Sequence, residues 1–326
     1  MDGWVDRLVQ RAERKETFRS ESALHEACYA SVSLGAVQRI LHLHPEANMI
    51  KDENGRIPLH WALTSKNQHA KARLLLHYLI TQRGEELPLE EIMLHRNNLG
   101  YTALDHACCS DAPPDIIESL LSICPRAAAH TNARRTGKTP LHMLLEYNKS
   151  NGTEVNTASA LLLLNAYPEA LAVGDRFGNL PLHYVCYRQE SFEAFHLLLN
   201  ASIKMGCVEL KNELDGTPLH AACVNDVPAE MIQYLLEASP RTVREMNNKG
   251  DTPLHLAFAH GASIELKNQL IDFGGEELFG IVNDRGQVPL QQGTLDDTFH
   301  VLISMPHLVM KYHDAVCTGD VGTYHF

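Results

Sequence analysis

Apolar residues recur along the chain in short segments that are separated by polar turns, and the segments come in pairs. The first segment of a pair follows a glycine-containing turn, and the second lies further downstream, as at 37–42, 116–123 and 231–236. A proline follows four of the second segments, and the residue before a proline is pushed out of the α conformation. The pattern predicts pairs of antiparallel helices, with four second helices ending at Pro45, Pro125, Pro168 and Pro240.

A short motif opens the first helix of each pair. Its strong copies begin with glycine and end with Pro-Leu-His, as in the segment from Gly250 to His255. Glycine adopts turn conformations that other residues resist, threonine can cap a helix, and proline fits the first helical position. The motif therefore predicts a helix start, and its strong copies are at 55–60, 137–142, 178–183, 216–220 and 250–255.

The motif recurs at a regular spacing. Its histidine position falls at 25, 60, 105, 142, 183, 220, 255 and 291, which gives steps of 35 to 45 residues. The motif resembles the Thr-Pro-Leu-His-x-Ala signature of the ankyrin repeat, whose period is about 33 residues. The Leu-Leu-x-x-x-Pro-x-Ala helix endings resemble a long-repeat variant of that family. The resemblance implies an all-α solenoid over residues 20–295, with about seven to eight helix-turn-helix repeats joined by short hairpin loops.

Both ends of the array are expected to carry helical caps, because a solenoid needs capping ends. Residues 1–19 place apolar side chains on one helical face, which favours a capping helix over attachment to a membrane. Residues 296–326 include an apolar stretch at 299–310 and form the predicted C-terminal cap and tail. The apolar face of the N-terminal helix consists of Trp4, Val5, Leu8, Val9 and Ala12.

Two of the steps between motifs carry insertions. The longer step holds an extra segment at 82–97, after a second helix, which is expected to lengthen a finger on the hairpin side. The other insertion, 147–157, lies between the two helices of its repeat and at the opposite end. Insertions of this length are either functional or disordered.

Nineteen histidines and eight cysteines invite a search for metal or catalytic sites. The ankyrin resemblance implies that the motif histidines bond to the loop and to neighbouring backbone, which is a structural role. Several cysteines recur three residues after the motif position, in a core slot, and equivalent positions on stacked helices lie about 8 to 10 Å apart, too far for a disulfide or a shared tetrahedral metal. The histidines are His25, His60, His142, His183, His220 and His255, and the cysteines are Cys28, Cys108, Cys186 and Cys223.

The sequence contains no nucleophile elbow, phosphate-binding loop or metal-ligand spacing. We therefore expect no enzyme activity, no cofactor and no metal. Two repeats depart from the structural motif, because Ala103 and Asp105 replace proline and histidine in the third repeat and Gln291 replaces histidine in the last. Each repeat of a solenoid contacts only its neighbours, so these two repeats are expected to be weaker and to open locally.

The charge balance argues against nucleic acid as a partner. Lys and Arg number 28 against 40 Asp and Glu, a net charge of −12, so the chain has no global positive field for phosphate backbones. The first residues lack the apolar core of a secretory signal, and no uncharged apolar run nears the roughly 18 residues of a membrane span. These features predict an intracellular, cytoplasmic protein with free thiols and no membrane insertion, with the nucleus as an alternative location.

In ankyrin proteins, partners usually lie along the concave face, which consists of the hairpin tips and the exposed side of the first helices. In the fourth and fifth repeats these positions hold four positive charges and one negative charge, Glu146. Arginine and aromatic side chains are enriched at binding hot spots. The predicted partner-binding residues are Arg56, Trp61, Tyr101, Arg135, Lys138, Tyr147, Arg176, Phe177, Tyr184, Tyr187 and Arg188.

The predicted function is a non-catalytic adaptor, scaffold or inhibitor, monomeric on its own, that binds a protein or peptide with acidic and aromatic side chains. The alternative for this surface is a set of solvated residues with no partner. The alternative for the whole chain is a regulatory or substrate-recognition subunit of an enzyme, ubiquitin-ligase or membrane complex. A cryptic enzyme is distinguished from both by a metal or cofactor that it retains through purification.

Overall fold

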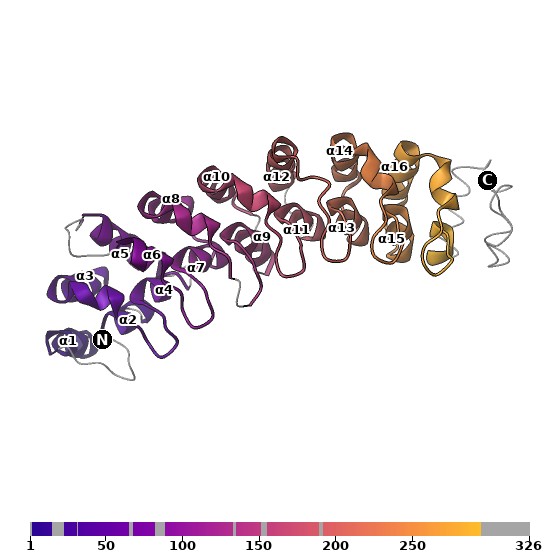
Figure 1. Ribbon diagram of the computed structural model, residues 1–326. Helices are drawn as coiled ribbons and strands as arrows, with labels where there is room; N and C mark the ends of the chain where they lie inside the picture. Colours follow the sequence, from indigo (N-terminus) through magenta and orange to yellow (C-terminus); the bar gives the residue numbers. More distant parts are fainter. Residues whose placement is uncertain are drawn as a thin grey trace. The chain divides into compact units, whose positions relative to one another are not determined.

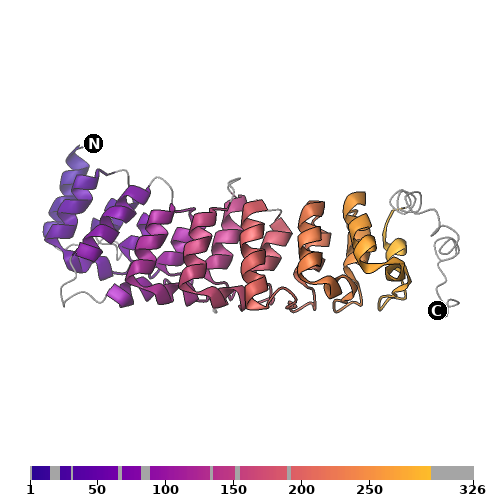
Figure 2. The same cartoon turned by 90° about the horizontal axis from the view of Figure 1, so that it is seen from above.

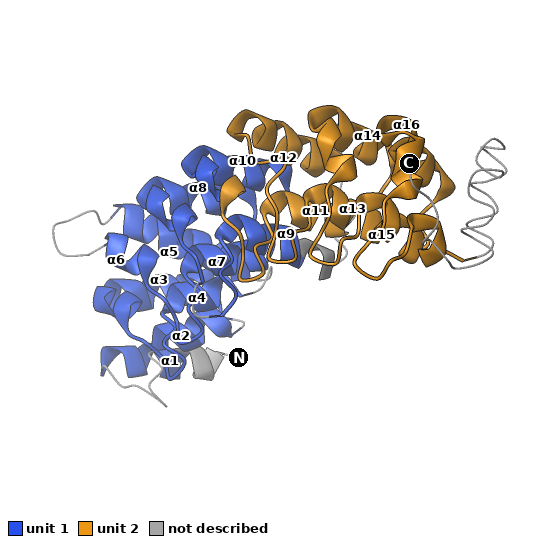
Figure 3. Cartoon of the chain, turned by 45° about the vertical axis from the view of Figure 1, so that its right-hand side comes forward, with its two compact units in different colours: residues 1–170 blue, residues 171–326 orange. Residues whose placement is uncertain are grey.

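The computed structural model describes part of the chain, and that part is helical without strands. The described residues are 2–14, 23–30, 32–64, 68–81, 89–132, 135–150, 155–188 and 192–294, with the side chains of 2–5, 148–150 and 188 excepted. The chain divides into two compact units, residues 1–170 and residues 171–326 (Figure 3). The predicted all-α class is confirmed in both units.

Unit 1 consists of a leading helix, α1 (Asp2–Glu13), and successive helix pairs. The first helices of the pairs stack in one layer and the second helices in another (Figure 1). Figure 2 shows the neighbouring helices of a layer side by side. The pairs are α2 (Ala23–Tyr29) with α3 (Leu34–Leu43), α4 (Pro58–Ala62) with α5 (His69–Thr81), α7 (Ala103–Cys109) with α8 (Pro114–Ile123), and α9 (Pro140–Ser150) with α10 (Thr157–Ala166).

Unit 2 repeats the same two-layer arrangement. Its core is apolar, and Phe195, Phe258 and Phe279 are fully buried between the layers. The pairs are α11 (Pro181–Arg188) with α12 (Phe192–Met205), α13 (Pro218–Val224) with α14 (Ala229–Ala238), and α15 (Pro253–Ala259) with α16 (Ile264–Gly274), followed by the 3₁₀ helices η6 (Glu276–Gly280) and η7 (Pro289–Gln292).

The four prolines end the second helices as predicted, and each begins a short 3₁₀ helix. Proline is tolerated there because the first residues of a helix have no internal acceptor for their N–H groups. After α5 the corresponding place is taken by α6 (Leu89–Leu94), which packs against α7 and α8. The 3₁₀ helices are η1 (Pro45–Met49), η3 (Pro125–Ala129), η4 (Pro168–Ala172) and η5 (Pro240–Arg244).

The two insertions are described in part. Residues 82–88 lie outside the described part of the chain, and 89–94 form α6. In the second insertion, α9 extends as far as Ser150, and Asn156 caps α10 by accepting from the Ser159 N–H at 3.2 Å. The residues between, 151–154, lie outside the described part.

The described part of the N-terminal segment packs as a helix on the first pair. In α1, Leu8, Val9 and Ala12 are buried, and the helix lies against α2 and α3. The side chains of Trp4 and Val5 lie outside the described residues, as does the whole of the predicted C-terminal cap and tail, 296–326.

The recurring cysteines are buried thiols in the first-helix layer. Cys28, Cys108, Cys186 and Cys223 are at most 1% exposed, and none of them is in a disulfide. Burial raises the pKa of the Cys28 thiol to about 12, which keeps the sulfur protonated and inert. These cysteines act as small apolar side chains, as their spacing predicted.

The hairpin glycines of unit 2 give a direct test of how closely the repeats stack. Gly178 has φ +71°, and a Cβ there would lie 2.7 Å from the backbone nitrogen of Glu213 in the next hairpin. Gly286 has φ +74° with nothing within 4 Å. A left-handed non-glycine residue costs roughly 1 to 2 kcal/mol, so Gly286→Ala should lower the free energy of unfolding by about 1 kcal/mol. Gly178→Ala adds the collision and should lower it by about 3 kcal/mol.

Urea unfolding of the two variants measures this difference. Both substitutions introduce the same methyl group at the same backbone conformation, so Gly286→Ala controls for the conformational term. Equal losses of stability would show that the approach of the next hairpin does not restrict residue 178.

Candidate protein-binding surface

The motif histidines fix each hairpin to the next one. In His60, Nδ1 accepts from the Ile57 N–H at 3.3 Å, so the neutral ring carries its proton on Nε2. That Nε2–H donates to the carbonyl of Tyr101 at 3.1 Å, one repeat further along. His183 makes the same pair of bonds, to Leu180 at 3.1 Å and to Gly216 at 3.0 Å. These are the loop and backbone bonds that the ankyrin resemblance implied.

Burial keeps these rings neutral. It lowers the pKa of His60 well below the usual value and lowers the pKa of His183 and His220 to about 4. A positive charge on a ring that burial has removed from water is unfavourable. The motif histidines therefore link neighbouring hairpins through hydrogen bonds, and they do not act as proton carriers at neutral pH.

In the third repeat a carboxylate, that of Asp105, takes the place of the motif histidine. Asp105 accepts from the N–H and hydroxyl of Thr102, at 2.8 and 3.0 Å, which caps α7. Its Oδ2 also lies 2.9 Å from Nδ1 of His130, and both side chains are fully buried. His130 precedes the next hairpin, so the pair again joins neighbouring repeats. The third repeat therefore has a contact with its neighbour that the motif alone does not reveal, and its expected weakness stays a prediction.

A second link joins each of two hairpins to the helix that follows it. Asp52 accepts from the Trp61 indole N–H at 2.9 Å, and Asp175 accepts from the Tyr184 hydroxyl at 2.7 Å. In both cases the helix residue lies nine positions after the carboxylate and directly after the motif histidine. Sequence reasoning placed this position on the exposed surface, and for Tyr184 that is wrong, because the side chain is 8% exposed. Tyr184 holds its hairpin and offers little area to a partner.

The hairpin face of a unit is defined here as its hairpin tips together with the outward side of its first helices. In unit 1, Arg135 is exposed and Tyr147 is 44% exposed. Lys138 is half-buried and pairs with Glu146 at 2.5 Å, which neutralises part of the predicted positive charge. Arg56, Trp61 and Tyr101 are half-buried. Unit 1 thus presents a basic and aromatic face, with Arg135 as its most accessible predicted cation.

In unit 2 the hairpin tips are apolar as well as basic. Phe177 is 53% exposed, and the Arg176 guanidinium lies 4.5 Å from its ring centre. Leu214, at the tip of the next hairpin, is 56% exposed, and the two tips are joined by a 2.9 Å bond from the Glu213 N–H to the Phe177 carbonyl. Sequence reasoning missed Leu214, although it lies six residues before its motif histidine, as Phe177 does. Tyr187 is half-buried, and the side chain of Arg188 lies outside the described residues.

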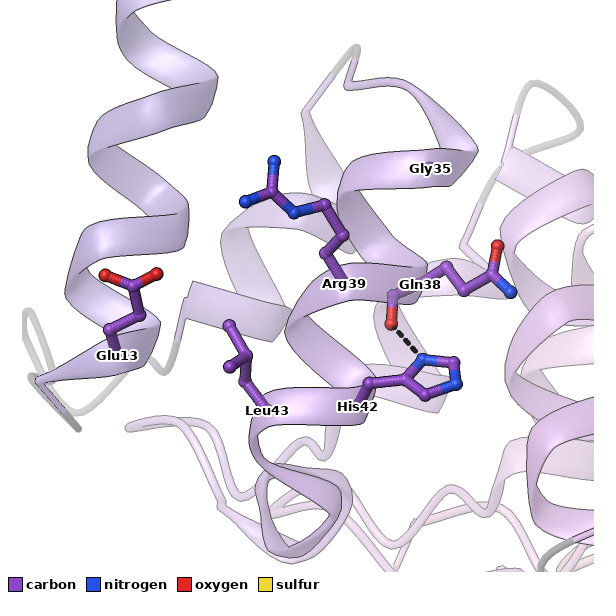
Figure 4. A pocket seen from close by; sticks show the side chains of 6 residues that line it. All are labelled: Glu13, Gly35, Gln38, Arg39, His42 and Leu43. Carbon is purple, nitrogen blue, oxygen red and sulfur yellow. Dashed lines mark hydrogen bonds between the residues drawn. The ribbon is translucent and has the colours of Figure 1, made fainter.

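The second-helix layer carries a shallow pocket of about 380 Å³ at α1 and α3 (Figure 4). Within it, Nδ1 of His42 donates to the Gln38 carbonyl at 2.7 Å, one turn earlier on the same helix. All its lining residues are exposed, so it has no buried polar group to orient a ligand. The lining residues are Glu13, Gly35, Gln38, Arg39, His42 and Leu43.

Within the part of the chain that the structure describes, no group of three or more His, Cys, Asp or Glu side chains could hold a metal ion. No helix in that part is long and apolar enough to cross a bilayer. The hairpin faces of the two units present cations, aromatic rings and apolar tips, which are side chains enriched at interfaces with other chains.

Two comparisons identify the architecture. Residues 24–125 and 182–278 match the family model of ankyrin repeats (3 copies). The crystal structure of the ankyrin repeat domain of Bcl-3 is similar in fold, with a TM-score of 0.57 and 22% sequence identity over 77% of this chain and 100% of that chain.

Curated relatives share the repeat region to different extents. The probable 26S proteasome regulatory subunit p28 of Saccharomyces cerevisiae is 28% identical over 206 residues, which is 62% of this chain and 79% of that protein. The B-cell lymphoma 3 protein homolog of Mus musculus is 27% identical over 239 residues, 73% of this chain and 48% of that protein. The human transient receptor potential cation channel subfamily A member 1 is 28% identical over 193 residues, but these are only 15% of its length.

Proposed function

Because this chain belongs to the ankyrin-repeat family, we propose that it is a non-catalytic interaction module, an adaptor, scaffold or inhibitor, that binds a partner protein through its hairpin face. The proposed partner segment is acidic and aromatic. Proteins of one fold bind different partners because their surface residues differ. The chemistry of the surface therefore decides which partner is bound.

One observation carries the proposal. Accessible cations and aromatic rings gather on the hairpin face of each unit, at Arg135 and Tyr147 in unit 1 and at Arg176 and Phe177 in unit 2, although the whole chain has a net charge of −12. A local positive surface attracts acidic segments, whereas the net negative charge of the whole chain keeps separate copies apart.

The test is affinity capture with the full chain as bait, followed by mass spectrometry of the bound proteins. Arg135→Glu and Arg176→Glu are compared separately with wild type, and each should lower recovery of a shared partner about tenfold, the effect of roughly 1.4 kcal/mol at a hot spot. Arg39→Glu on α3 and Lys204→Glu on α12 are matched controls, because they make the same charge reversal at exposed positions of the second-helix layer. Equal losses in all four variants would leave only a net-charge effect and contradict the proposal.

A regulatory subunit of an enzyme complex is a second candidate. It is favoured by the similarity to the probable proteasome regulatory subunit, because the matched region spans 79% of that protein rather than a single repeat. Native gel electrophoresis of the tagged chain with purified 26S proteasomes tests it. Co-migration that is lost on charge reversal at Arg135 or Arg176 would support this role, and migration of the chain only as a free protein would contradict it.

A further inference from the structure

Arg56 is a half-buried cation whose guanidinium has no anionic partner in the described part of the chain. It lies over the Trp61 ring, with 4.7 Å from Cζ to the ring centre, and its Nε is buried without a hydrogen-bond acceptor. The carboxylate of Asp52 in the same hairpin is already used. Its Oδ1 accepts from the Asn54 and Arg56 backbone N–H groups, and its Oδ2 accepts from the Trp61 indole. Because Arg56 as a whole is only half-buried, an anion from outside would meet the guanidinium at its accessible atoms and would be stabilised by its charge.

His106 provides a second donor beside Arg56. The Oδ1 of Asn97 accepts from two backbone N–H groups, of Leu99 and Tyr101, so its Nδ2 is the atom that faces His106. That Nδ2 donates to Nε2 of His106 at 3.1 Å, and a neutral ring whose Nε2 accepts carries its proton on Nδ1. The Nδ1–H has no acceptor among the described residues.

The two donors share one electrostatic environment. Burial, and after it the positive charge of Arg56, lower the pKa of His106 to about 4. The imidazole ring and the guanidinium therefore interact electrostatically. Aromatic rings surround the donors, with His60 5.2 Å and Tyr101 5.8 Å from His106, centre to centre. On the other side Tyr29, which is 64% exposed, meets Trp61 edge-on at 5.1 Å. Aromatic rings beside the donors lower the local polarity, which strengthens a hydrogen bond to a bound anion.

We propose that Arg56 and His106 bind a single carboxylate, the side chain of a glutamate or aspartate in the partner segment, and that Tyr29 and Trp61 contact the side chain next to it. This inference rests on the proposed function and names the group that unit 1 recognises. The planar guanidinium fork matches a carboxylate. The site offers one positive charge and one neutral donor, with the carboxylates of Asp52 and Asp105 nearby, so a monoanion fits better than the nearly doubly charged phosphate of a phosphopeptide.

The experiment is an NMR titration of the ¹⁵N-labelled full chain at pH 7. The probes are acetyl-glutamate methylamide, acetyl-glutamine methylamide and acetyl-phosphoserine methylamide. The signals are the Nε–H of Arg56 and the indole N–H of Trp61. We expect the glutamate probe to shift both signals with a dissociation constant in the millimolar range and at least about tenfold below that of the glutamine probe.

Two variants show whether the shift comes from this site. Arg56→Gln should abolish the response of the Trp61 signal while thermal unfolding stays unchanged. Arg96→Gln is the matched control, an exposed arginine just before the third hairpin, and should respond like wild type. Equal affinities for the glutamate and glutamine probes, or a response that survives in Arg56→Gln, would overturn the proposal. Tighter binding of the phosphoserine probe would also overturn it, in favour of a phosphate.

Failure here and failure of the proposed function have different signatures. If no probe binds at Arg56 but Arg135→Glu or Arg176→Glu loses the captured partner, the carboxylate site is wrong and the interaction module stands. If the glutamate probe binds at Arg56 and the charge reversals have no effect on capture, the carboxylate site is supported and the hairpin-face proposal is wrong.

Discussion

Lowering the pH from 7 to 5 should reduce the free energy of unfolding of unit 2 by about 4 kcal/mol. The reason is the pair of motif histidines His183 and His220. Burial lowers the pKa of each to about 4, against about 6.5 in an unfolded chain. Between these two values the unfolded chain takes up a proton at each histidine and the folded chain does not. Stability is therefore full above pH 6.5 and falls on acidification, by about 1.4 kcal/mol per pH unit for each histidine, until the folded rings also protonate near pH 4.

Urea unfolding at pH 7, 6 and 5 measures the effect, and local hydrogen exchange at 181–224 assigns it to unit 2. The double variant His183→Gln, His220→Gln should flatten the pH dependence. Glutamine can replace the cap, since Gln291 in the last repeat accepts from the Val288 N–H at 3.0 Å through its Oε1. Leu182→Ala is the control, because a buried cavity lowers stability at every pH and leaves the slope intact. An unchanged slope in the double variant would place the acid sensitivity at other groups.

Asp105→Ala should lower the free energy of unfolding of unit 1 by about 3 kcal/mol. The substitution removes the Asp105 half of the capping box of α7 and leaves His130 without the carboxylate that lies 2.9 Å from its Nδ1. Loss of a helix-capping contact costs about 1 kcal/mol, and leaving a buried polar group without its partner costs about 1 to 3 kcal/mol. Asp105→Asn keeps the acceptor for the Thr102 N–H and removes the charge, so its loss should be intermediate.

A double-mutant cycle separates the pair from the cap. If Asp105 and His130 interact across the two repeats, Asp105→Ala with His130→Ala should cost clearly less than the sum of the single variants. Thermal unfolding of the four proteins gives the coupling. Additive losses would mean that Asp105 acts as a cap alone and that the third repeat lacks the inter-repeat contact assigned to it.

The repeat register could be predicted from the sequence, and the behaviour of individual surface positions could not. Glycine, proline and leucine at fixed offsets dictate where each helix starts, because each acts through local backbone geometry. The position after the motif histidine is different, since its exposure depends on a hairpin residue nine places earlier. Tyr184 is held by the hydrogen bond from its hydroxyl to Asp175, whereas the Phe177 side chain has no donor for such a bond and stays exposed.

The same reasoning explains the third repeat. Asp105 looks like a defect when it is compared with the histidines at its motif position, because the motif contains no information about residue 130. The compensating histidine lies 25 positions away, next to a different hairpin. Contacts between repeats involve pairs of residues, and a pattern read one position at a time detects only one member of each pair.

The hairpin tips of unit 2 are connected in series, and this has a mechanical consequence. The Phe177 carbonyl accepts from Glu213, the Leu214 carbonyl from Asn248, and the Lys249 carbonyl from Asp284, one backbone bond per junction at 2.9 to 3.1 Å. When unit 2 is stretched along the line of its hairpin tips, each bond between neighbouring hairpins carries the same force. The bonds then break one after another rather than together. Unit 2 should therefore behave as a soft spring that yields in small steps, and a partner bridging two tips would stiffen the junction that it spans.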